Sequence, residues 1–159
     1  MTAQIPDSLN IEGLPSMVGC DMVIELHPRI IRLDEMAVSA SYPGTYSTNC
    51  HRDFLASWAI KEGRLYLIDV IGIYNLIGEE LLFAEWYRGT IRAGAGKFFR
   101  GSGFGYDFRC EREFAIDVND GVVINMKERM YEESGRQTNV EADALQPYEG
   151  EIPSWIRSR

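Results

Sequence analysis

Residues 49–53, which read Asn-Cys-His-Arg-Asp, carry the groups that a nucleophilic site needs. Cys50 supplies a thiol, His51 an imidazole and Asp53 a carboxylate, and a small cysteine hydrolase would use these groups. Neighbouring residues of a strand point to opposite faces, so Cys50 and His51 cannot form a dyad if the strand has already begun. His27 would then have to act as the base. The alternative, which we favour, is a buried structural cysteine beside a solvent-facing histidine.

Paired carboxylates are a second catalytic hypothesis, because two of them in one cleft can act as acid and base in a hydrolase. The carboxylates in or beside predicted strands are Asp53, Asp69, Glu85, Asp107 and Glu111. Most residues of this kind form the solvated face of a sheet. The sequence favours that interpretation.

The cysteines and histidines have none of the paired spacings of a zinc motif. They are Cys20, Cys50, Cys110, His27 and His51. No Cys-x-x-Cys or His-x-x-x-His is present, so we expect no metal and no cofactor, and we expect the three thiols to be free and reduced.

The glycine-rich residues 94–108 are the most unusual segment, because five glycines alternate there with aromatic and basic side chains. A phosphate loop is excluded, because Phe98 follows Lys97 where that motif has Ser or Thr. Gly-Phe-Gly-Tyr at 103–106 suggests a single-strand nucleic-acid surface, for which the candidates are Lys97, Phe98, Arg100 and Phe104. The position before that run is Ser102 rather than a basic residue. The favoured interpretation is a glycine-rich hairpin that carries core aromatics.

Two β-hairpins must position most of these side chains. Apolar and polar residues alternate over 106–118, Asn-Asp-Gly follows at 119–121, and Val122, Ile124 and Met126 then alternate with Asn125 and Lys127. Arg112 interrupts the apolar face and indicates a bend, a bulge or a charge at a buried edge.

The second hairpin joins residues 54–60 to 65–70 through Glu62 and Gly63. Trp58 lies on its apolar face, which predicts a core position. The consecutive apolar residues 66–68 predict a central strand that is covered on both faces.

Weaker patterns complete the fold. Residues 22–26 and 29–33 are predicted strands, 39–49 a loop, 75–82 a short helix capped by Asn75, and 83–93 a strand. We therefore predict an all-β or β-rich α+β domain over residues 1–130, an antiparallel sandwich or partly open barrel. Residues 131–159 are predicted to form an acidic, partly ordered tail.

The composition restricts the class of function. The chain has 159 residues and a net charge of −8, which opposes a broad grip on nucleic acid or anionic lipid. The start of the chain has no basic and apolar signal pattern, and no apolar run reaches the length of a membrane span. We expect a cytoplasmic protein that binds no membrane.

The middle third of the chain resembles a group of small uncharacterised bacterial proteins. The similarity lies in Ser-Thr-Asn-Cys-His-Arg at 47–52, the Trp-x-Ile and Leu-Tyr-Leu strands at 58–60 and 65–67, and Ala-Glu-Trp-Tyr-Arg-Gly at 84–89. His51 and Asp53 depart from the group, which has Trp and Gly there. The resemblance implies a bacterial cytosolic origin and gives no support to any catalytic activity.

These observations favour a non-enzymatic protein-binding factor, of the immunity or accessory type, that holds another protein through its acidic surface and exposed aromatics. Trp155 in the tail is the candidate anchor. The alternatives are the small hydrolase that uses Cys50 or paired carboxylates and the single-strand nucleic-acid binder that uses residues 97–106.

Overall fold

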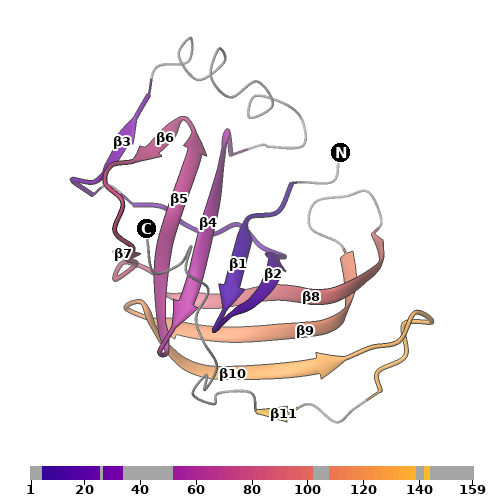
Figure 1. Cartoon of the computed structure of the whole chain (residues 1–159). Helices are drawn as coiled ribbons and strands as arrows, with labels where there is room; N and C mark the ends of the chain where they lie inside the picture. The colour runs from indigo at the N-terminus through magenta and orange to yellow at the C-terminus, as the bar shows by residue number, and fades with distance from the viewer. Residues whose placement is uncertain (1–4, 26, 34–51, 102–107, 139–141, 144–159) are drawn as a thin grey trace.

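A computed structural model describes residues 5–25, 27–33, 52–101, 108–138 and 142–143 (Figure 1). This part of the chain is all β, as predicted. Its strands are β1 (Ser8–Ile11), β2 (Leu14–Val18), β3 (Ile30–Arg32), β4 (Phe54–Lys61), β5 (Arg64–Gly72), β6 (Tyr74–Leu76), β7 (Leu82–Phe83), β8 (Gly89–Gly101), β9 (Phe108–Asn119), β10 (Val122–Met130) and β11 (Ala142–Asp143). Within the same residues, no helix is long and apolar enough to cross a membrane.

Nine of these strands form one sheet in the order β11-β10-β9-β8-β2-β1-β4-β5-β7, and β3 pairs with β6 in a small separate sheet. The large sheet is mixed. Strand β1 runs parallel to β4, whereas the pairs β1–β2, β4–β5 and β8–β9 are antiparallel. The long strands β8, β9 and β10 run across β4 and β5 in Figure 1. The sheet bends far enough for Val122 of β10 to pair with Arg64 of β5, which partly closes it into a ring.

Both predicted hairpins are confirmed. Glu62 and Gly63 have positive φ values of 53° and 74°, and Asp120 and Gly121 have values of 50° and 79°. Two successive residues in the left-handed region form the type I′ turn, whose twist matches that of antiparallel strands. The two turns also meet, because the Leu65 amide donates to the Gly121 carbonyl at 2.8 Å. The closure of the ring therefore lies where the two hairpin turns touch.

The core lies inside the ring, on the apolar faces of both hairpins. Trp58 is fully buried, which confirms its predicted core position. The other fully buried large side chains include Leu9, Met22, Ile60, Leu65, Leu67, Ile91 and Ile116.

The predicted cover on both faces of β5 holds at Leu67 and Ile68 and does not extend along the strand, and β5 is not central. Leu67 faces the core, whereas Ile68 packs on the outer face with Ala59 and Leu81. In strand order β5 lies next to the short edge strand β7.

The predicted helix at 75–82 is wrong. Asn75 pairs with Ile31 across β6 and β3, and Gly78 has a φ of 90° that would interrupt a helix. The Arg29 guanidinium donates to the carbonyls of Ile77 and Glu80, so a distant side chain satisfies the carbonyls of this turn.

Two strand predictions also need correction. No strand forms over 22–25, because the carbonyls of Met22 and Val23 accept hydrogen bonds from the side chains of Arg52 and Trp86 instead of from a neighbouring strand. The predicted strand 83–93 is divided between β7 and β8 by a turn in which the Tyr87 amide donates to the Ala84 carbonyl. Residues 29–33 contain β3, as predicted, and the loop 39–49 lies outside the described residues.

The break at Arg112 coincides with an irregularity in the neighbouring strand. Ala95 pairs with Arg112 and Phe98 with Cys110, so β8 has an extra residue opposite β9. Arg112 itself stays on the apolar side of β9, stacks on Phe114 and forms an ion pair with Glu128 at 2.5 Å.

Candidate functional site

The structure does not assemble the predicted nucleophilic site from the residues that it describes. Cys50 and His51 lie outside those residues. His27 lies beside β3, where its Nδ1 accepts a hydrogen bond from the Arg29 amide at 3.1 Å. No group of three or more His, Cys, Asp or Glu side chains is placed to hold a metal ion in the described part of the chain.

The predicted carboxylates lie apart from one another. The Asp53 carbonyl accepts a hydrogen bond from the Ile73 amide, so Asp53 lies level with Ile73. Asp69 precedes Ile73 by four residues, which places it about 13 Å away along the strand direction. That separation exceeds the roughly 5–9.5 Å of the carboxylate pairs in glycoside hydrolases. Glu85 is exposed on the turn between β7 and β8.

Glu111, the fourth described carboxylate of this set, lies on β9, where its Oε2 accepts from the Lys97 amide at 3.3 Å. Asp107 lies outside the described residues. The arrangement therefore supplies no acid–base pair from these described carboxylates.

The nucleic-acid candidates are described in part. Phe98 is 50% exposed. The Lys97 ammonium lies 5.9 Å from the Phe99 ring and 3.5 Å from a Glu133 carboxylate oxygen, so an acidic side chain adjoins its charge. The backbone of Arg100 lies on β8, but the position of its side chain is not described. Phe104 lies outside the described residues. Trp155 also lies outside the described residues.

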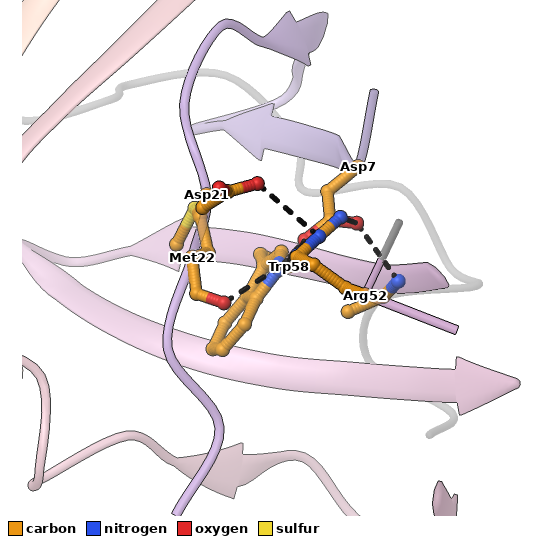
Figure 2. A network of polar contacts seen from close by, with 6 residues as sticks. Asp7, Asp21, Met22, Arg52 and Trp58 are labelled. Atoms are coloured by element: carbon orange, nitrogen blue, oxygen red, sulfur yellow. Dashed lines mark hydrogen bonds and ion pairs between the residues drawn. The ribbon is translucent and has the colours of Figure 1, made fainter. Parts of the chain in front are cut away.

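A buried carboxylate, which the sequence analysis missed, lies at the centre of a network of polar contacts (Figure 2). Asp7 has no exposed side-chain surface, and its Oδ1 accepts from Arg52 Nη2 at 2.7 Å and from the Ala56 amide at 3.0 Å. Its Oδ2 accepts from Arg52 Nη1 at 3.2 Å and from Trp58 Nε1 at 3.0 Å. Four donors therefore satisfy this carboxylate, two of them in a bidentate guanidinium pair.

The same guanidinium links this carboxylate to a third segment of the chain. Arg52 lies 3.4 Å from Asp21, donates to the Met22 carbonyl at 3.4 Å and stacks over the Phe54 ring at 4.7 Å. Nearby, burial raises the pKa of the Tyr87 phenol, and the neighbouring Cys20 and Asp7 raise it further. Because its donors and acceptors are satisfied inside the protein, this network is a structural link between the N-terminal segment and β4.

The outer face of β4 and β5 contains a groove instead. Its volume is about 270 Å³. It is lined by Pro6, Ser8, Leu55, Ala56, Ser57, Asp69, Val70 and Ile71. One predicted carboxylate, Asp69, is therefore placed in a concave site beside two serine hydroxyls.

A β-bulge places Asp69 in that groove. Trp58 pairs with Leu67, but Ser57 pairs with Asp69, so Ile68 is an extra residue in β5. In a regular strand Asp69 would share the inward face of Leu67. The bulge turns its carboxylate to the outer face, as bulges do where a side chain is re-aimed.

A second bulge exposes apolar side chains on β10. Val123 pairs with Val118 and Asn125 with Asp117, so Ile124 is the extra residue. Val123 and Met126 are buried, while Val122 is 41% and Ile124 59% exposed. The predicted alternation, which put Val122, Ile124 and Met126 on one face, is wrong because the bulge shifts the phase after Val123.

Val122 meets an aromatic group across the closure of the ring, and Ile124 lies two residues farther along β10. Arg64 pairs with Val122 and lies 5.7 Å from the Phe83 ring centroid, and Tyr66 lies 5.9 Å from the same ring. We call Arg64, Tyr66, Phe83, Val122 and Ile124 the seam patch. It lies on the outer face of β5, as does the groove.

A sequence signal exists for each bulge. Residues 65–68 and 122–124 are runs of four and three consecutive apolar residues within otherwise alternating strands. Such a run is compatible with either a strand covered on both faces or a bulge, and the pairing strand distinguishes the two.

Comparisons with known proteins find no match among family models, curated proteins or solved structures.

Proposed function

We propose that this chain is a non-enzymatic binding factor that holds another protein through the seam patch. The observation that carries the proposal is the exposure of Val122 beside Arg64 and two aromatic rings, with the exposed Ile124 two residues farther along β10. Aromatic side chains and arginine are enriched in the centres of protein interfaces, and contiguous exposed apolar groups on a soluble domain mark such sites.

The support of the patch suits it to recognition. The patch spans the junction of two type I′ hairpins, where the Val123 amide donates to the Gly63 carbonyl at 2.8 Å. Gly121 allows the Phe83 ring to lie close to the turn, since a Cβ there would approach that ring to 2.7 Å. Side chains on paired strands lose less freedom on binding than side chains on a mobile loop, so less ordering entropy opposes association.

The charge indicates the kind of partner. A net charge of −8 attracts a basic protein over long range and raises its association rate. Since the Debye length is about 10 Å at 0.1 M salt, the affinity should fall with ionic strength. The proposed bacterial origin, the cytoplasmic location and the role of Trp155 as an additional anchor are consistent with this function.

The test compares two aspartate substitutions at exposed isoleucines. Ile124→Asp alters the seam patch, whereas Ile77→Asp alters a 49% exposed isoleucine beside the small sheet and serves as the control. A partner recovered from the source cells is purified and titrated calorimetrically against each variant. We expect Ile124→Asp to weaken binding by about tenfold or more and Ile77→Asp to leave the affinity nearly unchanged.

Two results would contradict the proposal. Equal affinities for both variants would show that the seam patch is not the interface. The enzyme hypothesis would replace the binding hypothesis if no partner is recovered and Cys50→Ser abolishes a hydrolytic activity found by substrate screening.

A further inference from the structure

The groove on the outer face has two chemically different parts. Leu55, Ile71 and Pro6 supply apolar walls, while Ser8 and Ser57 are paired across β1 and β4 and carry hydroxyl groups. The Asp69 carboxylate lies across β4–β5 from Ser57, and its Oδ1 accepts from the Val70 amide at 3.0 Å. The described residues that line the groove include neither lysine nor arginine.

This lining matches a primary ammonium group at the end of a short alkyl chain. An ammonium has three donors, and a carboxylate with two hydroxyl oxygens can accept them. The methylene groups of such a chain bury well against aliphatic walls while the charge reaches polar groups. A volume of about 270 Å³ accommodates one long side chain rather than a folded segment of a partner.

We propose that the groove binds a lysine side chain of the protein partner, with its ammonium at Asp69, Ser8 and Ser57. The inference rests on the proposed function and adds a specificity site to it. Asp69 and Tyr66 lie on the same strand, about 10 Å apart along it, so a partner on the seam patch also reaches the groove. A standard interface of about 800 Å² on each partner is wide enough to cover both. The net charge of −8 favours a lysine-bearing partner.

The experiment uses a capped Gly-Lys-Gly peptide as the probe and the same peptide with norleucine as its uncharged control. Amide chemical shifts of the ¹⁵N-labelled full-length chain report binding, and the Val70 amide reports directly because it contacts the Asp69 carboxylate. We expect saturable shifts at residues 55–57 and 69–71, with millimolar affinity for the lysine peptide and at least about tenfold weaker binding of the norleucine peptide.

Variants of the chain separate this inference from the proposed function. Asp69→Asn should weaken binding of the lysine peptide by about tenfold or more, and Ser57→Ala should weaken it by a smaller factor. Asp120→Asn removes an exposed carboxylate elsewhere and should have no effect. Ile124→Asp should leave peptide binding unchanged even though it weakens binding of the protein partner.

The inference is overturned by an absence of shifts at about 20 mM peptide. Shifts that map outside the groove, or equal binding of the norleucine peptide, would also refute it. The spectra themselves show whether Asp69→Asn is folded. If it is not, a Ser8→Ala and Ser57→Ala double variant takes its place, and unchanged affinity of that variant refutes the site. If Ile124→Asp loses partner binding while the peptide experiments show no binding in the groove, the proposed function stands and the groove inference fails.

Discussion

Asp7→Asn tests whether the buried carboxylate network stabilises the fold. The side chain of Asp7 is fully buried and that of Arg52 is 10% exposed. The substitution therefore removes the negative charge that balances the Arg52 guanidinium at a site with little access to water. It also replaces one accepting oxygen by an NH₂ group that faces donors. Breaking a buried ion pair in this way costs about 3–5 kcal/mol. Arg52 keeps its contacts with Asp21 and the Met22 carbonyl, which favours the lower end of that range.

The assay is urea unfolding followed by tryptophan fluorescence. With a slope of about 2 kcal/mol/M, a loss of 3–5 kcal/mol lowers the midpoint by about 1.5–2.5 M. The exposed pair of Arg88 and Asp120, 2.6 Å apart, is the matched control, and Asp120→Asn should cost about 1 kcal/mol or less. This control also keeps a residue type that tolerates positive φ.

A double-mutant cycle then isolates the pair itself. Arg52→Met keeps most of the side-chain length and removes the charge. The combined Asp7→Asn and Arg52→Met variant should be more stable than the sum of the single changes implies, by at least about 1.5 kcal/mol. Additive changes, or a loss below about 1 kcal/mol for Asp7→Asn, would refute the view that this network holds the N-terminal segment on β4.

Two more predictions concern the turns and alkaline pH. The added Cβ of Gly63→Ala meets no atom within 4 Å, so this variant should lose only the roughly 1–2 kcal/mol of stability that a left-handed residue costs. Gly121→Ala should lose more, because its Cβ would lie 2.6 Å from a carbonyl oxygen. Equal urea midpoints of the two variants would contradict this difference. Burial raises the pKa of the Tyr87 phenol and of the Cys20 thiol above their ordinary values of 10.0 and 9.0. The folded state therefore holds these protons more tightly, so their contribution to stability is complete below pH 9 and falls as the pH rises above 9 and then 10. In urea melts from pH 8 to 11, Tyr87→Phe should reduce this loss, and a wild-type midpoint that does not fall would contradict the reasoning.

Several features could be predicted from the sequence because neighbouring residues encode them. Alternation of apolar and polar side chains predicts a half-buried strand, and Asp120-Gly121 or Glu62-Gly63 allows the backbone to adopt two positive φ values in succession. The two hairpins and the burial of Trp58 follow from these local patterns. The short helix was mispredicted because its capping signal at Asn75 is outweighed by pairing with β3, a segment more than forty residues away.

The candidate site depends on long-range pairing. Whether a short apolar run becomes a bulge is decided by the strand beside it, and the two bulges determine that Asp69 and Ile124 face outward rather than into the core. The Asp7–Arg52 pair joins residues 45 positions apart, and no local pattern marks either one. The sequence by itself determined the two hairpins, their turns and the excess of negative charge. Only the tertiary structure decided which side chains meet at the seam patch and the groove, because the register between distant strands depends on the packing of the whole ring.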